Sequence, residues 1–266
     1  MKTIVHISDL HFGTEDPEIV EDLFTDIEKL NADVLLVSGD LTQRSRTRQF
    51  LAAKSFLDRF TIPKVVIPGN HDIPLYNVIK RLRKPFKRFK FFISGEDFPE
   101  YEDNKISVVG VNSVRSRRWK GGRITEKQIN RLKKIFQQKD ETLIKLLAVH
   151  HNLVFSEETE NKKKQVRSAA ILQELTASRI DLILMGHDHK TFITGLPDPD
   201  AEVYDSILIQ AGTAVSRRTR SEKNSYNVLR IQNHQLEVES RSYENKSFRH
   251  RAFWRFERIN GKWYPD

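Results

Sequence analysis

Five short polar motifs, each placed directly after a short apolar run, constrain the fold of this chain more than any other feature. The runs are rich in β-branched residues and almost continuously apolar, which is typical of strands buried on both faces of a sheet. Helical patterns separate most of the runs, so we expect strand–helix–strand units and a largely parallel sheet. The motifs read Asp9-Leu10-His11, Gly39-Asp40, Gly69-Asn70-His71-Asp72, His150-His151 and Gly186-His187-Asp188-His189.

The motif side chains are expected to converge, because ligands of such sheets bind at the carboxyl ends of the strands. Carboxylate, amide and imidazole groups together suit Mn, Fe or Zn. The candidate ligands are too many for one metal ion that keeps a coordination position open for water. Two ions that share the Asp40 carboxylate would use all of them. The sequence therefore predicts a binuclear hydrolytic site for phosphate esters. Its candidate ligands are Asp9, His11, Asp40, Asn70, His150, His187 and His189.

The order of these motifs resembles that of the calcineurin-like metallophosphoesterase superfamily, in particular its bacterial branch near the class III cyclic nucleotide phosphodiesterases. The resemblance runs from Thr3 to about His189. It implies a four-layer αββα sandwich, in which two mixed β-sheets are flanked by helices. It also implies in-line attack by a metal-bridging hydroxide, with His71 reaching the substrate phosphate as a general acid or charge stabiliser. One metal would be held by Asp9, His11, Asp40 and His189, and the other by Asp40, Asn70, His150 and His187.

Residues beside the motifs have supporting roles in this interpretation. His151, adjacent to His150 on the expected strand, is predicted to point the other way and to support the structure or orient a ligand, and Asp72 and Asp188 suit turns or the orientation of imidazoles. The loop Asn112–Arg123 and the segment Gly212–Arg220 are either solvated or positioned to bind the substrate's anionic group. The candidates for substrate binding are Asn112, Arg115, Arg117 and Arg217, with Arg218 as an alternative to Arg217.

The remaining pattern predicts one domain over residues 1–266, with an α/β half that carries the motifs (1–190) and a β-rich half (191–266). Strands in the second half would form a meander that packs on the first sheet, closed by Ser247–Trp263 as an edge strand that could also support dimerisation. Expected helices are Pro17–Leu30, Thr42–Phe60, Thr125–Gln137 and Ala169–Ser178, and expected meander strands are Thr191–Leu196, Ile207–Gln210, Asn227–Ile231 and Leu236–Tyr243.

Composition limits the class of protein. Hydrophobic content of 38% supports a substantial core, and no apolar stretch approaches the roughly 18 residues of a membrane span. A strand begins almost at Met1, so we expect no signal peptide, and the absence of Cys fits a cytoplasmic location. The net charge of +9 favours anionic partners.

One stretch, Lys80–Phe92, interleaves seven Lys or Arg with four Phe. We expect an amphipathic segment whose aromatic rings enter the core while its cations stay solvated. The alternative is binding of nucleic acid or lipid headgroups.

The function predicted from these features is phosphodiesterase activity on a small nucleotide or similar diester. A nuclease, favoured by Asp9-x-His11-x-Gly13, or a phosphomonoesterase of the same superfamily are the alternatives. A nucleotide-sugar lipid hydrolase is disfavoured because His71 stands where those enzymes have Arg. A non-catalytic interaction module is disfavoured because the full set of candidate metal ligands is present. Substrate, metal identities and oligomeric state are left open by the sequence.

Overall fold

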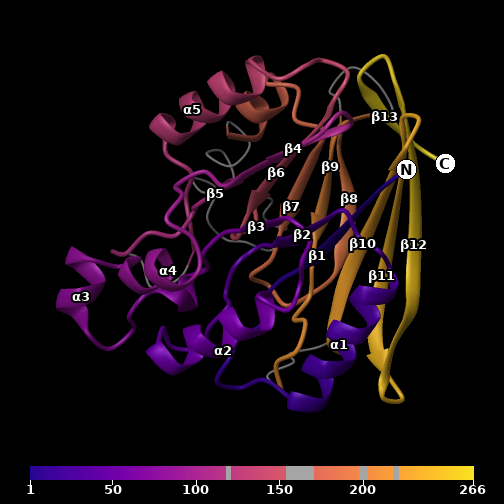
Figure 1. Ribbon diagram of the computed structural model, residues 1–266. Helices are drawn as coiled ribbons and strands as arrows, with labels where there is room; N and C mark the ends of the chain where they lie inside the picture. The colour runs from indigo at the N-terminus through magenta and orange to yellow at the C-terminus, as the bar shows by residue number, and fades with distance from the viewer. Residues whose placement is uncertain (118–120, 154–170, 198–202, 218–221) are drawn as a thin grey trace.

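A mixed, strongly curled β-sheet forms the centre of the molecule (Figure 1). The computed structural model describes residues 1–117, 121–153, 171–197, 203–217 and 222–266. Within them, strands hydrogen-bond in the order β3-β2-β1-β10-β11-β12-β13-β9-β7-β6-β5-β4, and β8 pairs with β9. The strands are β1 Lys2–Ile7, β2 Val34–Val37, β3 Lys64–Val66, β4 Glu100–Glu102, β5 Ile106–Val111, β6 Ile144–Val149, β7 Leu182–Met185, β8 Phe192–Pro197, β9 Tyr204–Gln210, β10 Ser225–Gln232, β11 Gln235–Glu244, β12 Ser247–Ile259 and β13 Lys262–Pro265.

The motif-bearing strands are parallel, as predicted, but they lie in two separate parts of this sheet. Strands β1, β2 and β3 pair in parallel on one side. Strands β5, β6, β7 and β9 pair in parallel on the other. The polar motifs therefore follow strands from both parts.

The mixed α/β class is confirmed, but the separate second sheet expected from residues after 190 is not formed. Strand β10 pairs antiparallel with β1, and β9 pairs with β7, so the late strands extend both early groups. Strand β13 joins the two parts through β12 and β9, which makes one continuous sheet. The reason lies in β1 and β10, whose adjacent residues are buried on both faces and so require an interior position in the sheet.

Three apolar clusters fill the space inside and outside the curl. The inner cluster joins both parts of the sheet, for example Leu36 with Leu146 and Trp263. One outer cluster packs helices α1 (Pro17–Lys29) and α2 (Thr47–Leu57) against the β1 side, and the other packs α5 (Glu126–Gln137) against the β6 side. The helices thus cover the outer surface of the sheet (Figure 1).

Local capping explains where the helices begin. Helix α1 (Pro17–Lys29) starts after Asp16, whose side chain accepts from the Glu18 amide, and α5 (Glu126–Gln137) has a capping box between Thr125 and Gln128. Of the predicted fourth helix, residues 171–178 are described, and 171–176 are helical.

Helix α2 (Thr47–Leu57) begins five residues later than predicted. Thr42 cannot enter a helix because its amide and hydroxyl both bond to Asp72, and because it forms a β-bridge with Phe12. The sequence pattern could not show this tertiary contact.

The basic, aromatic stretch forms two short helices, α3 (Val78–Arg83) and α4 (Lys87–Phe92), with Pro85 between them. Only Phe89 is buried as expected, while Phe91 is 79% exposed. The prediction that its aromatic rings enter the core is therefore wrong for Phe91. In the described part of the chain, no helix has the length and apolar character needed to cross a bilayer.

Candidate metal centre

The turns after β1, β2 and β7 hold the predicted ligands in an unusual backbone conformation. Backbone hydrogen bonds from the Asp9 amide to the Gly39 carbonyl (3.0 Å) and from the His11 amide to the Asp40 carbonyl (2.9 Å) join the first two turns. Left-handed backbone angles, with φ between 50° and 78°, occur at Asp9, His11, Asp40, His187 and His189. Residues other than glycine rarely adopt the left-handed backbone conformation. Backbone strain of this kind concentrates at functional sites.

The first group of candidate ligands consists of Asp9, His11 and His189, all buried. The Nε2 atoms of His11 and His189 lie 3.2 Å apart, and they lie 3.6 and 3.2 Å from Asp9 Oδ1. The other Asp9 oxygen accepts hydrogen bonds from the Ser8 hydroxyl and the His187 amide, at 2.7 and 2.9 Å. Asp9 is therefore oriented through Oδ2, and its Oδ1 is directed at the two imidazoles.

The second group is arranged around Asp40 and His150. His150 Nε2 lies 3.5 Å from Asp40 Oδ1 and 3.2 Å from Asn70 Oδ1. His150 Nδ1 donates to the Ser38 carbonyl at 2.7 Å, which leaves Nε2 as the nitrogen that faces the site. Asp40 Oδ2 lies 3.8 Å from His11 Nε2, so Asp40 lies between the two groups.

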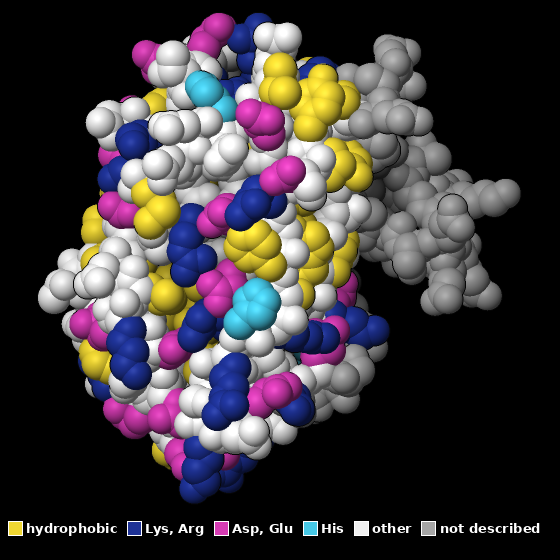
Figure 2. Space-filling view, turned by 90° about the vertical axis from the view of Figure 1, so that its right-hand side faces the viewer, with side chains coloured by type: hydrophobic (Ala, Val, Ile, Leu, Met, Phe, Trp, Pro, Cys, Tyr) yellow, Lys and Arg dark blue, Asp and Glu magenta, His cyan; other side chains and the backbone are white. Residues whose placement is uncertain are grey.

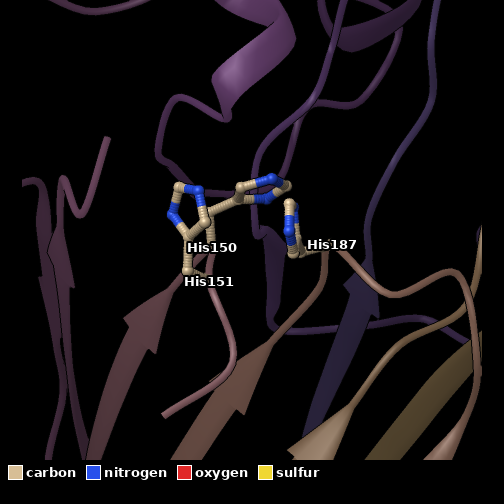
Figure 3. A group of neighbouring side chains, drawn as sticks. All are labelled: His150, His151 and His187. Atoms are coloured by element: carbon tan, nitrogen blue, oxygen red, sulfur yellow. The ribbon is translucent and has the colours of Figure 1, made fainter. Parts of the chain in front are cut away.

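His150, His151 and His187 form a third cluster, in which one nitrogen from each ring lies within 4.8 Å of the others. Figure 3 shows their imidazole rings gathered above the strand ends. The expectation that His151 points away is wrong, because β6 ends at Val149 and strand alternation no longer applies at residue 151. Its Nδ1 bonds to the Ser113 hydroxyl at 2.8 Å, and its ring centre lies 4.7 Å from that of His187.

The electrostatics of these groups favour a bound cation. Burial disfavours the charged form of Asp9, yet the adjacent imidazoles of His11 and His189 hold the pKa of its carboxyl well below the usual range. Burial likewise opposes ionisation of Asp40, but the nearby His150 lowers the pKa of Asp40. Burial lowers the pKa of His150, but the attraction of Asp40 outweighs it and raises the pKa to about 9. Within the described residues, no Lys or Arg forms an ion pair with either carboxylate.

The donor atoms fit metal ions. Among the described residues, the buried Asp9 Oδ1 has no partner in a well-formed hydrogen bond, and neither does His189 Nδ1. Two imidazole nitrogens and a carboxylate oxygen directed at one point are the ligands that Zn, Mn and Fe accept.

His71 occupies the edge of the site. Its ring centre lies 4.8 Å from that of His11, and its amide donates to Asp40 Oδ1 at 2.8 Å. The Nδ1 atom donates to the Gln43 carbonyl at 2.9 Å, which leaves Nε2 as the nitrogen able to meet a substrate. Burial lowers the pKa of the His71 imidazole.

Asp72 positions the two turns that carry Asp40 and His71. Its buried carboxylate accepts hydrogen bonds from the amides of Leu41, Thr42 and Gly69, and from the Thr42 hydroxyl. Gly69 is required there, because a Cβ at this position would collide with Asp40. Burial, with a contribution from Asp40, raises the pKa of Asp72 to about 6.

The predicted substrate-binding residues lie outside the metal-ligand groups. Asn112 and Arg115 make local contacts: the Asn112 side chain accepts from the Val114 amide, and Arg115 donates to Gln128 at 2.5 Å. Arg117 is exposed, and Arg217 pairs with Asp16 at 3.2 Å. Their roles stay predictions. Asp188 accepts from Asn152, and Arg218 lies outside the described residues.

Arg44 is a candidate that the sequence analysis missed. Its guanidinium lies 3.2 Å from His71 Nδ1 and donates to the Gln43 carbonyl at 2.9 Å. The one available signal was a cation four residues after Asp40, which is too common in loops to single it out.

Comparisons with known proteins agree with this geometry. A family profile described as calcineurin-like phosphoesterase matches residues 2–191. A probable cyclic nucleotide phosphodiesterase of Vesicomyosocius okutanii subsp. Calyptogena okutanii is 24% identical over 197 residues, 71% of this chain and 78% of the relative. Another, from Synechococcus sp., is 26% identical over 205 residues, 73% of this chain and 75% of the relative.

Among solved structures, a dimetal phosphatase from Danio rerio superposes with a TM-score of 0.64. It is 12% identical in sequence, and the match covers 94% of this chain and 98% of the other. At this identity the similarity shows the fold alone.

Proposed function

Since this chain belongs to the calcineurin-like phosphoesterase family, and is therefore a hydrolase of phosphate esters, we propose that it is a binuclear phosphodiesterase acting on small nucleotides or similar diesters. The observation that carries the proposal is the meeting of Asp9, Asp40 and His150 in one buried cluster, flanked by imidazoles on either side. Both parts of the sheet contribute to it, so we treat residues 1–266 as one functional domain.

Two ions fit the donor set better than one. Asp9, His11 and His189 would hold the first ion, while Asn70, His150 and His187 would hold the second, with Asp40 shared. Mn, Fe and Zn all accept these ligands. When bound, such ions lower the pKa of water and neutralise charge on phosphoryl oxygens.

The chain's own residues then have distinct tasks. His71, tied through Nδ1 to the Gln43 carbonyl, would in its imidazolium form carry a second proton on Nε2, and with it would either protonate the leaving oxygen or stabilise its charge. Asp72 holds the turns on both sides of Asp40 in place. These contacts fix the donors before substrate arrives, which is the basis of preorganised catalysis.

The preference for diesters rests on two lines of support. The curated relatives reported above are named probable cyclic nucleotide phosphodiesterases. A monoester dianion would also bind two ions strongly in its ground state, and such uniform binding does not raise kcat. Arg115, Arg117 and Arg217 are the proposed partners of the nucleotide's anionic portion.

The test measures kcat/KM of protein reconstituted with Mn²⁺, Fe²⁺ or Zn²⁺ on bis-nitrophenyl phosphate, mononitrophenyl phosphate, 2′,3′- and 3′,5′-cyclic nucleotides and single-stranded DNA. We expect the diester to exceed the monoester and at least one cyclic nucleotide to be cleaved. His150→Ala should abolish hydrolysis, whereas the matched control His250→Ala, at an exposed position, should leave it unchanged.

Other results would redirect or reject the proposal. A clear preference for the monoester would make the protein a phosphomonoesterase, and cleavage of single-stranded DNA ahead of small diesters would make it a nuclease. Failure of every metal-loaded form to cleave any substrate would leave a non-catalytic interaction module.

A further inference from the structure

A projecting basic and apolar surface lies beside the metal centre. Helices α3 and α4 extend away from the sheet at the left of Figure 1. The chain from Ile73 to Gly95 contains seven Lys or Arg and no Asp or Glu. We call the part of it that faces outward the α3–α4 surface; it comprises Tyr76, Val78, Ile79, Lys80, Leu82, Arg83, Lys84, Lys87 and Phe91.

Large apolar side chains are unusually exposed on the α3–α4 surface. Tyr76, Ile79 and Phe91 are 77%, 70% and 79% exposed, and Val78 and Leu82 are each 52% exposed. Single exposed apolar residues need no explanation, but a cluster marks a surface that binds something.

A groove of about 520 Å³ runs between the two helices. Its lining includes the apolar residues Pro74, Ile79, Pro85, Phe91 and Phe92. The other lining residues are the cations Lys80, Arg83, Lys84, Lys87 and Arg88. The groove thus brings apolar and cationic side chains together.

The charge on this surface is not neutralised within the described residues. Lys80, Arg83, Lys84 and Lys87 form no ion pair there, and the segment's one ion pair with a described residue joins Lys90 to Asp97. By contrast, Figure 2 shows Lys and Arg intermixed with Asp and Glu over the face on which β12 lies. That face includes the pair Arg255–Glu237. Unpaired cations beside exposed apolar side chains favour a strongly anionic partner.

We propose that the α3–α4 surface docks onto an anionic phospholipid bilayer. The exposed apolar side chains would enter the interface between headgroups and acyl chains, and the four cations would contact lipid phosphates. The charge argues against a second copy of this chain, because like charges would face each other. The aliphatic side chains Val78, Ile79 and Leu82 argue against nucleic acid, which is bound through aromatic stacking.

Docking would fix the orientation of the metal centre. Asn70 and His71 lie in the short helix η1 (Asn70–Asp72), directly before this segment. Arg81 fastens α3 to the body of the protein through the carbonyls of Pro74 and Ser116, at 3.1 and 2.7 Å. A bound bilayer would therefore lie beside the edge of the site that His71 occupies. This orientation does not depend on the proposed preference for diesters.

Co-sedimentation of the full chain with vesicles tests the proposal. One set of vesicles contains phosphatidylcholine alone, and the other contains phosphatidylglycerol as well. We expect binding only to the anionic set, with an affinity that falls as salt rises. Lys80→Ala/Lys84→Ala/Lys87→Ala should weaken it about 10²-fold, at roughly fivefold per cation. The control Lys127→Ala/Arg131→Ala/Lys134→Ala removes equal charge from the exposed face of α5, where no ion pair with a described residue is lost, and should have a much smaller effect.

The apolar contribution has its own variants. Ile79→Ser/Leu82→Ser should weaken binding by at least about tenfold, while Leu51→Ser, at a position 51% exposed on α2, should not. Phe91→Trp should show a blue-shifted emission on adding anionic vesicles. Hydrolysis of bis-nitrophenyl phosphate and the melting temperature of each variant should match those of the parent protein.

Three results would overturn the proposal. The first is no binding to anionic vesicles, the second is equal loss in the α3–α4 and α5 triple variants, and the third is full binding by Ile79→Ser/Leu82→Ser. Single-stranded DNA that binds more tightly than vesicles through the same lysines would reassign the surface to nucleic acid.

Discussion

Replacing Asp72 by Ala should destabilise the protein even without metal, because Asp72 acts on backbone amides and is not a ligand. Its carboxylate accepts from the amides of Leu41, Thr42 and Gly69 at 3.1, 2.8 and 2.9 Å. The Thr42 hydroxyl, at 2.8 Å, is a fourth donor, but it can turn to the His71 carbonyl, which lies 3.3 Å away.

Three buried amides would therefore lose their acceptor. An unsatisfied buried donor costs about 1–2 kcal/mol, so the free energy of unfolding should fall by roughly 3–6 kcal/mol. Asp72→Asn keeps the shape and one acceptor oxygen, and we expect an intermediate loss.

Urea unfolding of chelator-treated protein, followed through the fluorescence of buried Trp263, measures this loss. The matched comparison is His189→Asn, which removes a proposed ligand while keeping a residue that tolerates the left-handed backbone. His189→Asn should weaken metal binding and change the stability of the metal-free protein by less than about 1 kcal/mol. A loss below about 1 kcal/mol in Asp72→Ala would refute the reasoning, since the amides would then have found other partners.

Three further predictions concern the metals, the leaving group and pH. Asp40→Ala should remove more metal than any other single substitution and abolish the rise in melting temperature on adding Mn²⁺; fully active parent protein with about one ion per chain by elemental analysis would contradict the shared-carboxylate assignment. His71→Ala should keep both ions yet lose roughly 10²–10⁴-fold in kcat, less for a nitrophenolate leaving group; an equal loss for good and poor leaving groups would leave charge stabilisation alone. Burial lowers the pKa of His6 in the folded protein to about 3. The fold therefore favours neutral His6, and the stability this provides is present above the pKa of the unfolded chain and is lost as pH falls. Between about pH 7 and 5, the free energy of unfolding of the metal-free parent protein should fall by about 2 kcal/mol more than that of the His6→Gln variant. Parallel pH profiles of the two proteins would disprove this assignment.

The sequence predicted the candidate site better than the sheet around it. Asp9, Asp40 and His150 follow buried strands that read clearly as apolar runs, and strand ends meet at one edge whichever strands are neighbours. The pairing of β10 with β1 could not be predicted, because it joins residues more than two hundred positions apart and both strands have similar apolar patterns.

The sequence pattern also could not predict the directions of side chains beyond the strand ends. The alternation rule placed His151 on the wrong side, because β6 ends before it. The helix pattern from Thr42 was wrong for its first turn, because the Asp72 carboxylate is a stronger partner for the Thr42 amide. The first error comes from the extent of a strand, and in the second a tertiary contact overrides a local preference.

The left-handed backbone at Asp9, His11, Asp40, His187 and His189 has an evolutionary consequence. Glycine adopts this conformation without cost, whereas other residues lose of order 1 kcal/mol each, less for Asp. In a duplicated gene released from selection for hydrolysis, the histidines at positions 11, 187 and 189 could drift to glycine with relief of this strain, whereas losing Asp9 or Asp40 would leave the His187 or His71 amide without its acceptor. Glycine at the three histidine positions, with both aspartates kept, would therefore mark descendants that have given up catalysis.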